Sequence, residues 1–126
     1  MQKKFINPET MPPTFGYSHV VEVSNAKRKI YISGQVAINT DGQIVGIDNL
    51  ATQTRQVFEN IKSALETSEL KFNDVVKLTF FLTDISRDIR DQYIDTKNPP
   101  ASSAVEVRKL INDNFLIEIE AIAVAN

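Results

Sequence analysis

The chain has 126 residues, with 14 Lys and Arg, 16 Asp and Glu and a single His, so its net charge at pH 7 is about −2. This length fits one compact domain, and the interspersed charges do not favour electrostatic capture of nucleic acid or an anionic membrane. The absence of cysteine excludes disulfides, thiolate metal sites and a cysteine nucleophile.

The N-terminal segment lacks the pattern of a targeting signal. Lys3 and Lys4 are not followed by an apolar run, and no stretch approaches the length of a transmembrane helix. We therefore expect a cytoplasmic protein. Residues 1–16 contain three prolines and Gly16 without regular periodicity, which predicts an irregular arm lying on the domain.

Two strands are predicted next, over residues 17–24 and 29–38, because apolar and polar residues alternate along both. The polar turn at residues 25–28 predicts that they form a hairpin. A turn with the favoured Asp-Gly pair follows at residues 39–42, and a brief edge strand is expected at residues 44–46.

Gly34 interrupts the second of these strands. Alternation puts Gly34 on the face of Ile30 and Ile32, with Ser33 and Ala37 on the other face. A strand glycine costs stability and packs nothing, so Gly34 marks either a bulge or packing contact, or the close approach of a ligand.

A helix is predicted over residues 50–67, with Asp48 or Asn49 as its N-cap. Its apolar stripe at helical spacing consists of Leu50, Val57, Phe58, Ile61, Ala64 and Leu65. The residues expected to face water are Gln53, Arg55, Gln56, Glu59 and Lys62.

Residues 75–82 are largely apolar on both faces, which predicts a central strand covered on both sides. A second, shorter helix is predicted from Asp84 to about Thr96. Its apolar residues, four apart, are Ile85, Ile89 and Tyr93. Pro99 and Pro100 follow its end, since proline cannot continue a helix.

The chain closes on two predicted strands, over residues 99–107 and 116–124. One face of the last strand is wholly apolar and belongs in a core: Ile117, Ile119, Ala121 and Ala123. The other face carries Glu118, Glu120, Ile122 and Val124. Because a carboxylate is costly to bury unless it is paired, this second face is either solvated or lines an interface or a pocket.

The predicted element order is β-β-α-β-α-β-β. Such an order indicates an α+β fold, with a mixed sheet and both helices on one face. The second face of the sheet also carries apolar residues, so we expect another copy of the chain to cover it and form a homo-oligomer.

Several segments together resemble the YjgF/RidA family of reactive enamine/imine deaminases, also labelled the endoribonuclease L-PSP family. The helix with Gln53, Asn60 and Ile61 matches, as do Gly-Tyr-Ser-His-Val-Val at 16–21, Ile-Tyr-Ile-Ser-Gly-Gln-Val at 30–36, Val-Val-Lys-Leu-Thr-Phe at 75–80, Thr-Asp-Ile at 83–85, Ser-Ala-Val-Glu-Val at 103–107 and Ile-Glu-Ile-Glu-Ala-Ile-Ala at 117–123. The resemblance runs over nearly the whole chain, in register.

The resemblance implies one RidA-like domain over residues 1–126 with a chorismate-mutase-like (ferredoxin-like) fold. It also implies a homotrimer with a ligand cleft between each pair of adjacent subunits. Active members of the family hydrolyse enamines and imines to 2-oxo acids and ammonia, without a metal or a cofactor.

The family's functional residues transfer to matching positions. Tyr17 matches the cleft tyrosine and Glu120 the glutamate that positions a water, so these two are the candidate catalytic residues. Gly34, beside Ser33, matches the glycine whose backbone approaches the ligand. Ala104 stands where the family often has a cysteine whose backbone N–H meets the ligand carboxylate.

The main departure from the family is at Ser102. Family deaminases carry an arginine in a Pro-x-Arg-Ser/Thr motif that clamps the substrate carboxylate, whereas residues 100–103 here read Pro-Ala-Ser-Ser. A guanidinium makes a planar two-point link to a carboxylate, and a serine offers one neutral hydrogen bond. The loss could weaken carboxylate binding by a few kcal/mol.

For several residues the pattern alone leaves a plainer role open. His19 is expected to be structural or on the surface, because no second His or Cys suggests a metal site. Glu120 could be an interface or solvated carboxylate, and Tyr17 a half-buried aromatic with its hydroxyl in water. The arginines that could replace the missing cation, but fit surface positions better, are Arg87, Arg90 and Arg108.

Two functions therefore compete. The first is an enamine/imine deaminase whose specificity is altered by Ser102, acting on an imino or oxo acid. The alternative is a non-catalytic trimer that binds a small molecule. RNA cleavage, a label sometimes attached to this family, is disfavoured because the chain has no basic patch and one uninvolved histidine.

Overall fold

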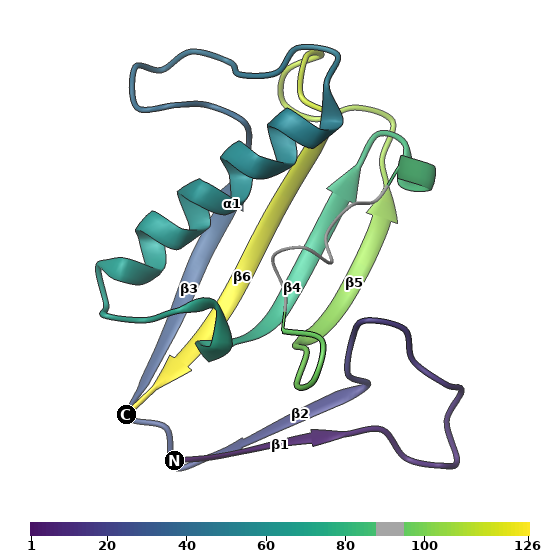
Figure 1. Cartoon of the computed structure of the whole chain (residues 1–126), viewed down its shortest axis with the longest axis vertical. Coiled ribbons are helices and arrows are strands. Elements are labelled where there is room, and N and C mark those ends of the chain that lie inside the picture. Colours follow the sequence, from purple (N-terminus) through teal and green to yellow (C-terminus); the bar gives the residue numbers. More distant parts are fainter. Residues whose placement is uncertain (88–94) are drawn as a thin grey trace.

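A four-stranded mixed sheet with one long helix across it forms the centre of the molecule (Figure 1). The structure, a computed structural model, describes residues 1–87 and 95–126. Its elements are β1 (Gln2–Ile6), β2 (Val20–Ser24), β3 (Arg28–Gln35), α1 (Leu50–Glu66), the 3₁₀ turn η1 (Phe72–Asp74), β4 (Val75–Leu82), the 3₁₀ turn η2 (Ile85–Arg87), β5 (Ala101–Glu106) and β6 (Ile117–Ala125). The large sheet has the order β3-β6-β4-β5, with β4 and β5 parallel and the other neighbours antiparallel, which confirms the predicted α+β class.

The helix α1 begins and packs as its sequence predicts. Asn49 is the N-cap, and its Oδ1 accepts a hydrogen bond of 3.0 Å from the backbone N–H of Thr52. The helix lies across β3 and β6 in Figure 1. Its stripe is buried against the sheet through Val57, Phe58, Ile61 and Leu65. Each such side chain contributes about 1.5–3 kcal/mol relative to an exposed one.

Gln53 was predicted to face water, and this is wrong. Its side chain is fully buried and makes three hydrogen bonds, to Gly46 O (3.1 Å), to Asn114 O (2.7 Å) and from Leu116 N (2.8 Å). A polar side chain is tolerated in a core when its polar atoms are all bonded. Helical periodicity could not reveal this, because the partners come from two distant loops.

The N-terminal arm and the predicted hairpin both need correction. Residues 2–6 form β1, which pairs antiparallel with β2 in a separate two-stranded sheet. β3 pairs with β6 at the other end of the chain and not with β2. The reason is burial: the apolar face of β3 (Ile30, Ile32) completes the core beside β6, while β1 supplies β2 with a neighbour.

Gly34 lies in a β-bulge, which was one of the two predicted roles. Ile32 is paired with Ala121 and Gln35 with Ile119, so β3 uses one residue more than β6 at this point. The extra residue reverses the alternation. Gly34 therefore lies on the face of Glu118 and not on the core face, and Ala37, predicted on the face opposite Ile30 and Ile32, is fully buried.

The turn after β3 is present, but the edge strand is not. Gly42, with φ +76°, donates from its backbone N–H to Asn39 O over 3.0 Å. Of residues 44–46, Ile44 forms only an isolated bridge with Ile38. This segment instead runs into the N-terminus of α1, where Asp48 also has a positive φ.

β4 is the central strand that the sequence predicts, with the same bounds. Its inner side chains Leu78, Phe80 and Leu82 are buried, while Thr79 and Phe81 on the opposite face are only partly covered within one chain. The two closing strands are not neighbours, because β4 lies between β5 and β6. The predicted core face of β6 is confirmed, with Ile117, Ile119, Ala121 and Ala123 all buried.

The second predicted helix, over 84–96, falls mostly on residues 88–94, outside the described part of the chain. On its N-terminal side the chain forms η2, where Asp84 Oδ1 accepts a hydrogen bond from Ser86 N over 3.1 Å. On its C-terminal side, Asp95 and Thr96 are not helical.

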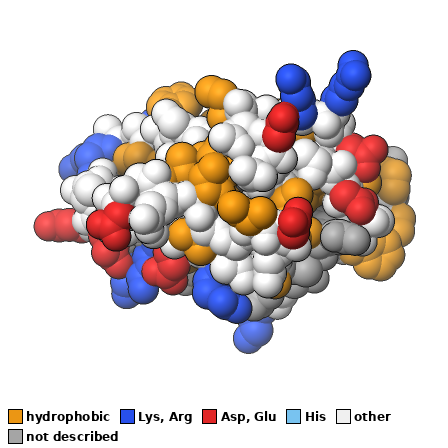
Figure 2. All heavy atoms as spheres, turned by 90° about the horizontal axis from the view of Figure 1, so that it is seen from above, with side chains coloured by type: hydrophobic (Ala, Val, Ile, Leu, Met, Phe, Trp, Pro, Cys, Tyr) orange, Lys and Arg blue, Asp and Glu red, His pale blue; other side chains and the backbone are white. Residues whose placement is uncertain are grey.

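The surface is mixed in charge and partly apolar. On the side seen in Figure 2, lysine and arginine side chains are scattered among acidic and apolar ones. The sheet face opposite α1, which we call the open face, carries Tyr31 (72% exposed) and Val105 (44% exposed). Within the described ranges, no helix is both long and apolar enough to cross a membrane.

Candidate functional site

A hollow of about 260 Å³ on the open face brings two predicted site residues together. We call it the Glu120 hollow. It is lined by Tyr31, Ile32, Ser33, Lys77, Thr79, Glu120, Ala121 and Ile122. Its walls are contributed by β3, β4 and β6, so rigid strands and not loops position its polar groups.

Strand register explains why these polar side chains meet. Residues paired across neighbouring strands point to the same face of a sheet. Thr79 of β4 is paired with Glu120 of β6 on one side and with Ser103 of β5 on the other. Lys77, two residues before Thr79, donates from Nζ to Ser103 Oγ over 3.0 Å. A row of polar groups therefore crosses three strands on the open face.

The bulge in β3 brings Gly34 against the neighbouring strand β6. A Cβ built on Gly34 would lie 2.8 Å from Cδ of Glu118 and would overlap its Oε2. Only a residue without a side chain leaves Glu118 in this place. The bulge thus positions Ser33 at the hollow and the backbone of Gly34 beside a carboxylate.

Ser102 and Ala104 lie on the other face of the sheet. Ser102 is paired with Leu78 and Ala104 with Phe80, and both of these partners are buried on the core side. Ala104 packs against the core. Within one chain, therefore, neither residue lines the Glu120 hollow, because strand side chains alternate between the two faces.

Tyr17 lies on the segment before β2, beside the N-terminal end of β5. Its neighbour Ser18 donates from Oγ to Pro99 O (2.6 Å) and from its backbone N to Pro100 O (3.1 Å). The ring of Tyr17 is edge-on to that of His19, with centroids 5.6 Å apart. Tyr17 thus lies next to the segment that leads into β5 and does not line the Glu120 hollow.

His19 has contacts that suit a structural role. Its Nε2 is 2.7 Å from Pro12 O, and its backbone N–H donates to Asn7 Oδ1 over 2.8 Å. These bonds hold the loop between β1 and β2. Across the described ranges, no three His, Asp or Glu side chains are gathered closely enough to hold a metal ion.

Lys77 and Thr79 are functional candidates that neither the sequence pattern by itself nor the family motifs indicate. Their signal was present: a lysine and a threonine two residues apart, within an otherwise apolar strand, point to one face. What the sequence lacked was the strand order, which puts that face beside Glu120.

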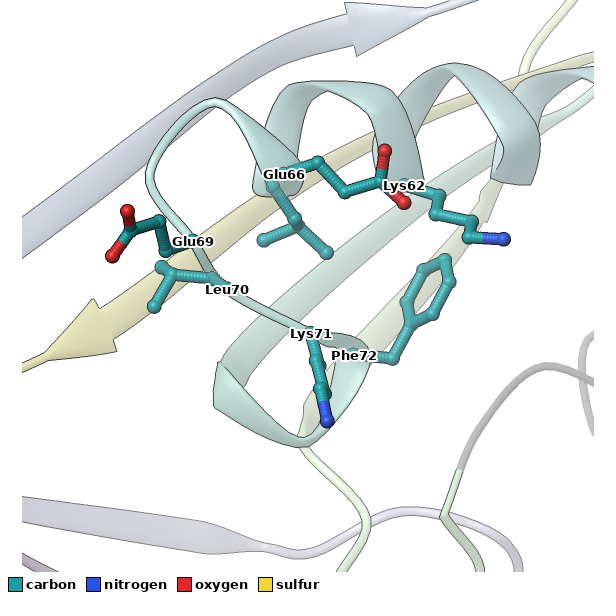
Figure 3. Close-up of a pocket in the computed structure, with 7 residues that line it drawn as sticks. Lys62, Glu66, Glu69, Leu70, Lys71 and Phe72 are labelled. Carbon is teal, nitrogen blue, oxygen red and sulfur yellow. The ribbon is translucent and has the colours of Figure 1, made fainter.

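A second and larger pocket, of about 500 Å³, lies where α1 ends and η1 begins (Figure 3). Its lining residues are Lys62, Leu65, Glu66, Glu69, Leu70, Lys71 and Phe72. Figure 3 shows that its charged groups point in different directions and do not converge on one position. None of the predicted site residues lines it, so we take the Glu120 hollow as the candidate site.

Comparisons with known proteins agree with the motifs. Residues 8–125 match the family described as endoribonuclease L-PSP. A RutC family protein of Pyrococcus abyssi is 39% identical to this chain over an alignment of 130 positions, which covers 98% of each chain.

Two solved structures show the same fold. The Rid-family protein YyfB of Yersinia pestis has a TM-score of 0.84 at 35% identity, over 98% of this chain and 99% of that one. A Mycobacterium tuberculosis member of the YjgF/YER057c/UK114 family has a TM-score of 0.66 at 31% identity, over 87% of each chain. This likeness agrees with the predicted chorismate-mutase-like fold. The chain therefore belongs to the endoribonuclease L-PSP family, which is the YjgF/RidA family that its motifs resemble.

Proposed function

We propose that the protein is a homotrimer that hydrolyses reactive enamine or imine intermediates to 2-oxo compounds and ammonia. The proposal rests on the position of Glu120, which lines a small hollow together with Ser33 and with Lys77 and Thr79 of β4. A carboxylate there can take a proton from a water molecule as the water attacks the imine carbon. The carboxylate passes this proton to the nitrogen, which gives a carbinolamine. Transfer of the carbinolamine O–H proton to the nitrogen, again through the carboxylate, then breaks the C–N bond, releases ammonia and leaves the 2-oxo compound.

The distribution of the site residues supports assembly into a trimer. Glu120 and Ser33 lie on the open face, whereas Ser102 and Ala104 lie on the other face of the same sheet. One chain cannot bring these groups around a single ligand, but clefts between adjacent copies can combine them. The exposed Tyr31 on the open face offers apolar area for such a contact.

Ser102 supports altered specificity within this activity. The position that carries the clamping arginine in family deaminases holds a short neutral side chain here. The same substitution supports the second candidate function, a trimer that binds a small molecule without turnover. The scattered basic side chains on the side seen in Figure 2 favour a small ligand over nucleic acid or a membrane as partner.

The deaminase proposal is tested with freshly generated 2-aminoacrylate, by following the release of pyruvate above solvent hydrolysis. We expect the protein to accelerate the release and Glu120→Gln to lower kcat/KM by about 100-fold or more. The matched control is Glu59→Gln, an exposed carboxylate on α1, which should act like the unmodified chain.

No acceleration at high protein concentration, across several such intermediates, would contradict the deaminase proposal. Ligand-dependent thermal shifts without product would then favour the binding function. Sedimentation equilibrium tests the assembly separately, and we expect the mass of three chains.

A further inference from the structure

We propose that Lys77 is the cation that binds the carboxylate of a 2-imino or 2-oxo acid in the Glu120 hollow. This inference deepens the proposed function and rests on it for the reacting nitrogen, but not for carboxylate binding. It gives the site a positively charged group that can bind the ligand carboxylate, although Ser102 replaces the motif arginine.

The position of Lys77 is the first argument. Of the eight described residues that line the hollow, Lys77 is the one basic residue. It comes from β4, where it is paired with Ala101 of β5 and with Ile122 of β6 just after a register shift between β4 and β6, so its backbone is held on both sides. Of the arginines considered from the sequence, Arg108 does not line the hollow. The side chains of Arg87 and Arg90 lie outside the described part of the chain.

The hydrogen bonding of Lys77 is the second argument. An ammonium group has three N–H donors, and Lys77 Nζ uses one of them on Ser103 Oγ at 3.0 Å. Among the described residues, no carboxylate lies within ion-pairing distance of Lys77. The side chain is half-buried, so a carboxylate that enters the hollow gains a partly desolvated, charge-assisted hydrogen bond.

The separation of charges in the hollow defines the class of ligand. Lys77 and Glu120 line the same space but do not pair with each other. A ligand with a carboxylate near Lys77 and a protonated imine nitrogen near Glu120 satisfies both groups. The volume of about 260 Å³ suits a small acid of this kind. Because lysine is a point charge on a flexible stem, it accepts carboxylates in more orientations than a guanidinium does.

The experiment compares the binding of 2-oxobutanoate with that of its methyl ester, by isothermal titration calorimetry. We expect the unmodified protein to prefer the acid, and Lys77→Met to weaken binding of the acid by about tenfold or more with no change for the ester. Lys77→Arg should keep most of the preference. The matched control is Lys62→Met on α1, which removes an exposed lysine far from the hollow and should bind like the unmodified chain.

Equal binding of the acid by Lys77→Met and the unmodified protein would overturn the proposal, as would no binding of the acid by the unmodified protein. If Lys77→Met fails to fold, Ser103→Ala is used in its place, because this variant removes only the hydrogen bond that positions the Lys77 ammonium. We expect it to bind the acid several-fold more weakly. Unchanged binding would overturn the proposal. Binding needs no turnover. If Lys77→Met loses binding of the acid but the unmodified protein has no deaminase activity, only the proposed function is refuted. If the unmodified protein is active but Lys77→Met binds the acid unchanged, only this inference is refuted.

Discussion

Gly34 lies so close to Glu118 that the Glu118 side chain can keep its position only because residue 34 has no side chain. The bulge in β3 turns Gly34 toward β6, where a Cβ would lie 2.8 Å from Glu118 Cδ. Because φ of Gly34 is not positive, its backbone conformation is open to other residues. The requirement for glycine here is thus one of space and not of backbone conformation.

Gly34→Ala should lower the free energy of unfolding by about 1 kcal/mol. The added Cβ meets the end of a flexible side chain, so Glu118 rotates away at the cost of an unfavourable rotamer. Urea denaturation at a fixed protein concentration measures the change. A loss several times larger would mean that the backbone of β3 moves as well.

The same contact predicts coupling between the two positions. In a Glu118→Ala background, Gly34→Ala should cost nothing, because the clash is gone, so a double-mutant cycle should give a coupling of about 1 kcal/mol. Additive effects of the two substitutions would contradict the contact.

Gln53→Leu should lower the free energy of unfolding by about 3 kcal/mol. Leucine has a similar size but leaves the partly buried Leu116 N–H and Asn114 C=O without the partners that the fully buried Gln53 side chain provides. Gly46 O loses less, since it also accepts a hydrogen bond from Asn49 N. Urea denaturation again measures the difference.

The control for this variant is Gln56→Leu, the same substitution one turn further along α1. Gln56 makes one side-chain hydrogen bond, to Asn60 Oδ1 at 2.9 Å, at a partly buried site that water can reach. We expect a loss below about 1 kcal/mol. Equal losses for the two variants would show that the loops held by Gln53 do not depend on its polar atoms.

Ser102→Arg tests whether the second sheet face contributes to the same ligand site. If Ser102 and Glu120 meet across a subunit boundary, the added guanidinium should increase the affinity for 2-oxobutanoate about tenfold or more, because it can make a two-point link. Calorimetric titration measures the affinity. Ser102→Gln, similar in length but neutral, is the control and should bring no such gain.

Unchanged affinity for 2-oxobutanoate in a folded Ser102→Arg trimer would show that Ser102 does not contact the ligand bound in the Glu120 hollow. That result would leave Lys77 as the cation of the site and would remove Ser102 from it.

The elements built on strong local patterns were predictable from the sequence. The bounds of β4, the N-cap and stripe of α1 and the two faces of β6 follow from periodicities of 2 and 3.6 residues, which depend only on backbone geometry. The comparisons confirm the family that the motifs indicate, while Glu120 and Gly34 as site residues stay predictions.

Which residues share a face could not be read in the same way. The bulge at Gly34 reverses the alternation after it, and one extra residue is enough to turn Ala37 from the face opposite Ile30 and Ile32 into the core. Gln53 is an equivalent case on the helix, because its three partners lie in segments that only the folded chain brings together.

The sequence by itself therefore determined the family, the fold class and the residue types at the candidate site, including a serine in place of the motif arginine. Only the tertiary structure decided that β4 lies between β5 and β6, which puts Lys77 and Thr79 beside Glu120 and turns Ser102 to the opposite face. The physical reason is that strand order and register are set by long-range burial of the apolar faces. Local propensity determines only where a strand begins and ends.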